Sequence, residues 1–90
     1  MINQLFLVGK IKEIDTLKDN KLMVEVERNY KNPEGVFEKD YFKCDLWIAL
    51  SKRIGLNCKN GDVVAIKGRL VADSGNCHIL AEQVILLNKG

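Results

Sequence analysis

The stretch that decides the fold runs from Asp40 to Leu70 and reads DYFKCDLWIALSKRIGLNCKNGDVVAIKGRL. It predicts a long strand rich in aromatic and basic side chains, then a short helical connector, then another strand. This last strand begins after the turn-forming pair Asn60-Gly61 and ends at Gly68-Arg69-Leu70. A single helical connection is therefore expected inside a chain that is otherwise β-rich.

The first strand of this stretch, residues 36–50, has two chemically different sides. Side chains of one parity are all apolar and are expected to face the core: Phe42, Cys44, Leu46 and Ile48. The other parity interleaves rings with charges and is expected to be a solvated binding face: Tyr41, Lys43, Asp45 and Trp47. Ser51 is then predicted to cap a helix of about two turns.

Apolar alternation predicts the remaining strands. Gly9 lies inside the first of them and is expected at a barrel corner, where the backbone bends or another chain approaches closely. The parity of the last strand changes near Glu82-Gln83, which predicts a β-bulge. The expected ranges are 2–14, 22–30, 63–72 and 77–87.

Five strands with one helix between the third and fourth indicate an all-β fold, the five-stranded Greek-key barrel called the OB-fold. An SH3-like barrel is the competing architecture. The long first strand and the position of the helix favour the OB-fold. A chain of 90 residues has enough material for one core, so residues 1–90 are expected to form a single domain.

Composition narrows the class of protein. The chain is 47% hydrophobic and 29% charged, and its apolar runs fall short of the roughly 18 residues of a membrane span. With no basic leader at its start, it is expected to be a soluble cytoplasmic protein. The three widely spaced cysteines indicate neither a disulfide framework nor a zinc site. His78 has no second ligand nearby, and Asp40 and Asp45 lack a metal motif, so neither a cofactor nor enzymatic activity is expected.

Several segments resemble the bacterial and phage single-stranded DNA-binding protein family. They are NQLFLVGK (3–10), VERNY (26–30), DYFKCDLW (40–47), the following stretch to Gly68-Arg69-Leu70, and ILAEQV (79–84). Three features depart from the family pattern. Ile48-Ala49 replaces Gly-Lys after the tryptophan, the hairpin between the last two strands is short and lacks a ring, and the acidic glycine-rich tail that recruits repair and replication enzymes is missing.

The resemblance implies a set of binding residues. Bases are expected to stack on Tyr30, Tyr41 and Trp47, as in OB-folds that bind single strands. Cations are expected along the phosphate path at Lys10, Arg28, Lys31, Lys39, Lys43 and Arg69. Family members assemble as homotetramers or dimers, so Ile2 and Phe6 are expected at a subunit interface, with a tetramer favoured over a dimer.

The leading functional hypothesis is sequence-independent binding of single-stranded DNA, which would coat and protect it at nucleoid replication sites, in recombination or in DNA transfer. The alternative is a primosomal replication-restart subunit related to the same family, which would act mainly through protein partners. A third hypothesis is an RNA-binding OB module.

Overall fold

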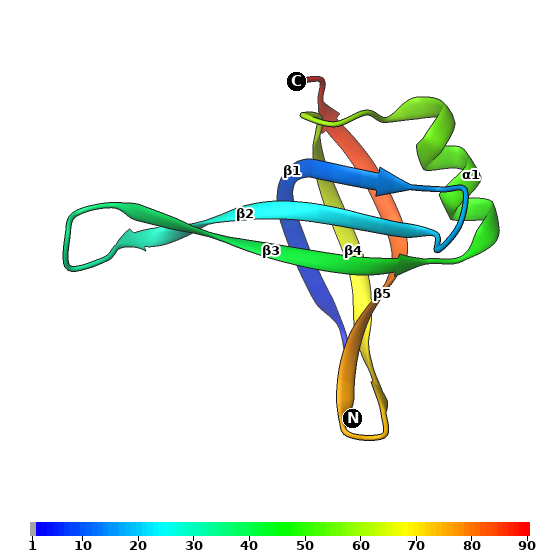
Figure 1. Ribbon diagram of the computed structural model, residues 1–90, viewed down its shortest axis with the longest axis horizontal. Coiled ribbons are helices and arrows are strands. Elements are labelled where there is room, and N and C mark those ends of the chain that lie inside the picture. Colours follow the sequence, from blue (N-terminus) through cyan, green and yellow to red (C-terminus); the bar gives the residue numbers. More distant parts are fainter. Residues whose placement is uncertain (1) are drawn as a thin grey trace.

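Five strands close into one barrel, and a single helix connects β3 to β4 (Figure 1). The computed structural model describes residues 2–90. The elements are β1 (Leu5–Asp15), β2 (Lys21–Lys31), β3 (Phe37–Leu46), α1 (Ile48–Asn57), β4 (Val63–Asp73) and β5 (Asn76–Asn88). The strand order around the barrel is β1-β2-β3-β5-β4, and β3 and β5 pair in parallel while the other pairs are antiparallel. The predicted OB-fold class is confirmed.

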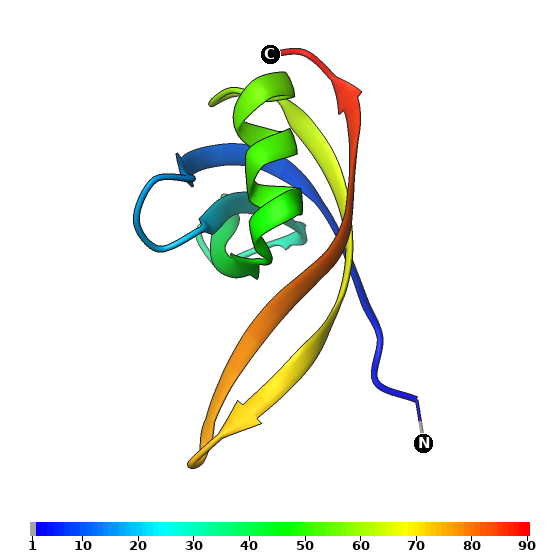
Figure 2. The same ribbon diagram turned by 90° about the vertical axis from the view of Figure 1, so that its right-hand side faces the viewer.

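Alternating side chains of the strands fill the barrel, and α1 covers one side of it beside the β1–β2 turn (Figure 2). Leu22 and Val24 of β2 are fully buried, and Leu50 and Ile54 of α1 join the same core. Burying a side chain of this size contributes roughly 1.5–3 kcal/mol. The other core members are Ile11, Cys44, Leu46, Val64, Ile66, Ala81 and Val84.

The predicted boundary between the third strand and the helix is wrong. β3 ends at Leu46 and α1 begins at Ile48, with Trp47 at the helix N-cap position. Ile48 is therefore exposed on the helix instead of buried in the core. Ser51 is not the cap either, because it lies inside α1, where its buried hydroxyl donates to Asn20 Oδ1 at 2.8 Å. The chain must leave the barrel wall early to bring Leu50 and Ile54 onto the core.

Two glycines mark places where strands approach too closely for a side chain. A Cβ at Gly9 would lie 2.5 Å from the carbonyl oxygen of Glu25, and one at Gly68 would lie 2.4 Å from that of Leu80. Gly9 was expected at a barrel corner; the structure shows the close approach of β2 of the same chain at this position. The bulge predicted in the last strand is also present, since Lys67 pairs with Gln83 and Gly68 with Ala81, which leaves an extra residue in β5.

Two hairpins extend away from the barrel as arms (Figure 1). The β2–β3 arm comprises residues 27–39, and the β4–β5 arm comprises residues 69–80. The β4–β5 arm closes through Ser74 and Gly75, both with positive φ, which is the type I′ geometry that fits the twist of a hairpin. Asn3 makes two hydrogen bonds to the backbone of Leu70 at the base of this arm.

Within residues 2–90, no helix has the length and apolar character needed to cross a membrane. The three cysteines are free. Burial raises the pKa of the Cys44 thiol to about 11, so this side chain packs as a small hydrophobe.

Candidate nucleic-acid interface

One side of β3 carries rings and cations in alternation. Because successive strand residues point to opposite faces, Phe37, Lys39, Tyr41 and Lys43 lie together on the outer face, while Phe42 and Cys44 point inward. We call these four residues the β3 outer row. Tyr41 is 52% exposed, and its hydroxyl donates to Glu25 Oε1 at 3.2 Å. This contact fixes the edge of the ring while much of its surface stays open to solvent.

Neighbouring strands continue this face. Lys10 of β1 and Tyr41 of β3 both pair with Glu25 of β2, so the three side chains form one line across the sheet. Lys39 Nζ lies 3.7 Å from the same Glu25 carboxylate. Among residues 2–90, four of the predicted cations take part in no ion pair: Lys10, Lys31, Lys43 and Arg69.

Trp47 lies just past the end of β3 and is 55% exposed. It was predicted to share the strand face with Tyr41. The structure instead places it where the chain turns from β3 into α1. Trp47 thus follows the end of the β3 outer row, and its carbonyl oxygen accepts the N–H of Ser51 at 2.9 Å in the first turn of the helix.

The other end of the row lies on the β2–β3 arm. Lys31 pairs with Phe37 there and places its Nζ 5.6 Å from the centre of the Phe37 ring. The preceding residue, Tyr30, is 61% exposed and has the opposite strand parity. Phe37 is a half-exposed ring that the sequence analysis missed, although its parity with Tyr41 was a usable signal. Asn32 Oδ1 accepts the N–H groups of Glu34 and Val36, each at 3.0 Å, which closes the arm.

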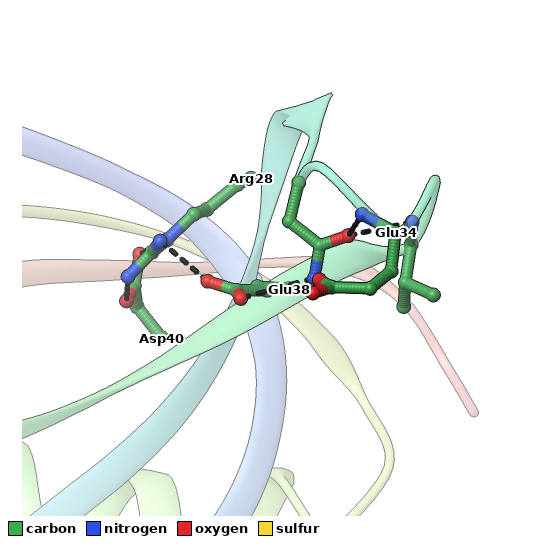
Figure 3. Close-up of polar contacts among 6 residues, drawn as sticks. Arg28, Glu34, Glu38 and Asp40 are labelled. Atoms are coloured by element: carbon green, nitrogen blue, oxygen red, sulfur yellow. Dashed lines mark hydrogen bonds and ion pairs between the residues drawn. The ribbon is translucent and has the colours of Figure 1, made fainter.

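Arg28 does not share the face of the β3 outer row. Its Nε and Nη2 donate to Asp40 at 3.0 and 2.8 Å, and its Nη1 donates to Glu38 at 2.7 Å (Figure 3). Asp40 has the inward parity of Phe42 on β3, opposite to that of Tyr41. The pairing raises the pKa of Arg28 and holds the pKa of Asp40 below its usual range. The positive charge of Arg28 is therefore largely compensated, and its contacts brace the arm.

This brace predicts an acid-sensitive arm. The lowered pKa of Asp40 means that its stabilising contribution is complete at neutral pH and is lost as the pH falls through that lowered value. In Asp40→Asn, the acid-dependent change of the arm should become smaller, because Arg28 then keeps only its pair with Glu38. Backbone amide shifts of residues 27–39, followed by NMR from neutral to acidic pH, measure this. Glu34→Gln is the control, since Glu34 makes none of the ion pairs among residues 2–90. Identical acid profiles for Asp40→Asn and the unmodified protein would contradict the role of the pair.

The remaining predicted residues lie elsewhere. Arg69 is exposed at the base of the β4–β5 arm; it pairs with Leu80 of β5, which pairs with Asp45 of β3, so one strand separates Arg69 from the end of β3. Ile2 is exposed next to β1. Phe6 is 69% exposed and lines a shallow apolar groove on the outer face of β1, β4 and β5. Val8 and Ile85 line the same groove and were missed as interface candidates.

The closed barrel, its strand order and its single connecting helix define the chain as an OB-fold protein. No protein-family model matches it. It is 31% identical over 77 residues to single-stranded DNA-binding protein B of Bacillus subtilis, in a match that covers 78% of this chain and 68% of that protein. The chain therefore belongs to the single-stranded DNA-binding protein family, as its resemblance predicted.

One more curated relative and two solved structures are also similar to the chain. Single-stranded DNA-binding protein 1 of Streptococcus pyogenes is 30% identical over 77 residues, which cover 78% of this chain but only 59% of that protein. The small single-stranded DNA-binding protein of Streptomyces coelicolor superposes with a TM-score of 0.64 at 16% identity, over 96% of this chain and 95% of that one. A Plasmodium falciparum single-stranded DNA-binding protein, solved in complex with single-stranded DNA, superposes with a TM-score of 0.70 at 13% identity, over 98% of this chain and 96% of that one. These structures share the fold.

Proposed function

We propose that the chain binds single-stranded DNA without sequence preference by stacking bases on exposed rings. The observation that carries this proposal is the β3 outer row, in which half-exposed rings alternate with lysines. Bases stack on Tyr41, on Trp47 just past the end of the row and on Tyr30, an exposed ring of the β2–β3 arm. Every base has a flat face, so such contacts tolerate any sequence. Membership of the family supports the same ligand.

The charged side chains around the β3 outer row favour one path for the phosphates of a bound strand. Lys43 borders a shallow pocket that is otherwise rich in carboxylates, lined also by Glu13, Asp15, Asp19, Lys21 and Met23. Its three carboxylates outnumber its two lysines, which disfavours phosphates inside the pocket itself. Lys39 and Lys31 lie on the opposite side, toward the tip of the β2–β3 arm. The phosphate path therefore runs along the row from Lys43 toward the arm, with Phe37 as a further stacking ring.

A fluorescence titration with oligo(dT) tests the proposal. Trp47 is the single tryptophan of the chain, so quenching reports contact at one defined ring. If oligo(dT) does not quench the Trp47 fluorescence of the folded protein at low salt, the proposed binding site is wrong. Matched titrations with oligo(dT) and oligo(U) separate a DNA binder from an RNA-binding module, since the proposal expects DNA preference or indifference.

Salt dependence tests the cations separately. Each phosphate contact on a single strand contributes about −0.7 to the slope of log affinity against log salt concentration. Lys39→Gln and Lys43→Gln should each make the slope shallower by about 0.7. Lys67→Gln on β4 is the control, because Lys67 lines the groove of β1, β4 and β5 and is not part of the β3 outer row. Unchanged slopes in both test variants would remove these lysines from the path.

We also propose that copies of the chain assemble through the outer face of β1, β4 and β5, as a tetramer in preference to a dimer. We call this surface the assembly face; its apolar members are Phe6, Val8, Ala65 and Ile85. The strand register puts Val8, Ala65 and Ile85 in one line, with Phe6 in the next. Contiguous apolar surface of this kind is typical of subunit interfaces. Ile2 lies beside the same strand.

Charge on the assembly face should break the assembly. Val8→Lys and Ile85→Lys should each lower the molar mass measured by light scattering during gel filtration, because a buried lysine at an interface loses its hydration. Val36→Lys is the matched control, since Val36 is equally exposed on the β2–β3 arm. A monomer at micromolar concentration in the unmodified protein would contradict oligomerisation itself.

A further inference from the structure

A second apolar surface lies away from the β3 outer row, where the β1–β2 turn meets α1. Leu17 of the turn is 95% exposed and Leu56 of the helix is 86% exposed. They line a groove of about 480 Å³ together with Thr16, Lys52 and Gly55. We call it the helix–turn groove. Neither leucine is buried in the barrel core, so the fold leaves both side chains available for another molecule.

The groove is built by contacts that hold its two walls together. A Cβ at Gly55 would lie 3.2 Å from Thr16 Oγ1, so the absence of a side chain lets the helix approach the turn closely. On the turn, Asp15 Oδ1 accepts the N–H groups of Leu17 and Lys18 at 3.2 and 3.1 Å. Leu17 is therefore presented by a hydrogen-bonded turn, and a ligand meets a formed surface.

The charged side chains near the groove are mainly cations. The segment from Leu46 to Gly61 contains Lys52, Arg53 and Lys59 and no carboxylate. Lys52 lines the groove, and Lys18 follows Leu17 in the turn. Of the nearby carboxylates, Asp15 is bonded into the turn, and Asp19 lines a different pocket. The groove thus combines aliphatic walls with cations, which suits an apolar ligand of negative charge.

A peptide fits this chemistry better than a nucleic acid. Bases need flat rings to stack on. The helix–turn groove, as formed within residues 2–90, is lined by aliphatic and polar side chains, whereas the exposed rings other than Phe6 lie on and beside β3. We propose that the groove docks an acidic, apolar segment of a partner protein. An aliphatic or aromatic side chain of the partner would lie between Leu17 and Leu56, and its carboxylates would face Lys52 and Lys18.

NMR titration of the protein with three short synthetic peptides tests the proposal. The first combines Asp and Glu with Leu and Phe, the second carries Lys in place of the acids, and the third carries Ser in place of the apolar residues. The first peptide should bind and shift the backbone amides of Leu17, Gly55 and Leu56. The other two should bind at least about tenfold more weakly, because the second lacks the acidic side chains and the third lacks the apolar ones.

Variants locate the contact. Leu17→Ser, Leu56→Ser and Lys52→Glu should each weaken binding of the first peptide about tenfold. Val36→Ser and Arg69→Glu are the controls, because they change an exposed valine and an exposed cation on the two arms. All three test residues are exposed, so their replacement leaves the core intact. Equal effects of the test and control variants would overturn the proposal.

Other occupants give distinct results. Oligo(dT) that displaces the first peptide would assign the groove to nucleic acid. A fall in molar mass on Leu56→Ser would assign it to a second copy of the chain. Localised shifts with none of the peptides would leave the groove without this function. Each of these results overturns the proposal. Trp47→Ala should retain peptide binding, so a failure of DNA binding and a failure of this groove are distinguishable.

Discussion

Replacing Tyr41 and Trp47 together by alanine should lower the affinity for single-stranded DNA by roughly 30-fold or more. Each base stacked on an aromatic ring is worth about 1–3 kcal/mol, and these two rings are separate platforms on the same strand and its end. Because the variant has no tryptophan, the anisotropy of a fluorescently labelled oligo(dT) is the appropriate measurement. The loss should be similar for oligonucleotides of different sequence.

Conservative variants separate stacking from other effects. Tyr41→Phe removes the hydrogen bond to Glu25 but keeps the ring, and Trp47→Phe keeps a smaller ring. Both should retain most of the affinity. Circular dichroism should show an unchanged fold for all variants, since both side chains are half exposed. Full affinity in the double alanine variant would show that the bases stack elsewhere.

Gly68→Val should destabilise the barrel by about 3 kcal/mol or more, a large share of the roughly 5–15 kcal/mol that stabilises a typical domain. The new Cβ would lie 2.4 Å from the carbonyl oxygen of Leu80 and 3.3 Å from the Cα of Ala81. Both contacts are with backbone, so no side-chain rotation can relieve them. Urea denaturation followed by far-UV circular dichroism measures the loss.

Lys67→Val is the matched control for this glycine. It adds the same β-branched side chain one residue earlier on β4, with its side chain on the outer groove instead of against β5 backbone. Its free energy of unfolding should change little. Equal destabilisation by both substitutions would show that β-branching in this part of β4, and not the close approach at Gly68, is responsible.

The strands and the outer face of β3, the candidate binding face, were predictable from alternation alone. Tyr41 and Lys43 lie on the outer face of β3 because polar and apolar residues alternate without interruption from Tyr41 to Leu46. The end of β3 was not predictable in this way. The segment Trp47 to Leu50 alternates poorly, and its apolar residues fit a buried strand as well as a short helix. Only closure of the barrel decides between them.

The position of Arg28 could not be predicted for a different reason. Its pairing with Asp40 depends on the register of β2 and β3, which shifts between Glu27 and Lys31. The exposed polar segment from Glu27 to Lys31 has no apolar alternation that could mark this shift, unlike the parity change that marked the bulge in β5. The helix–turn groove likewise joins Leu17 to Leu56, which lie far apart in the chain and share no pattern.

The β4–β5 arm offers a position for site-specific labelling. Its tip turns through Ser74 and Gly75 in a two-residue connection, and the surrounding side chains are exposed, so an insertion or a dye there leaves the core untouched. Cys77 supplies an exposed thiol on this arm, while Cys44 is buried and Cys58 is partly covered. A maleimide dye should therefore react first at Cys77. Energy transfer from this dye to a labelled oligonucleotide would report how a bound strand lies relative to the barrel, without any engineered cysteine.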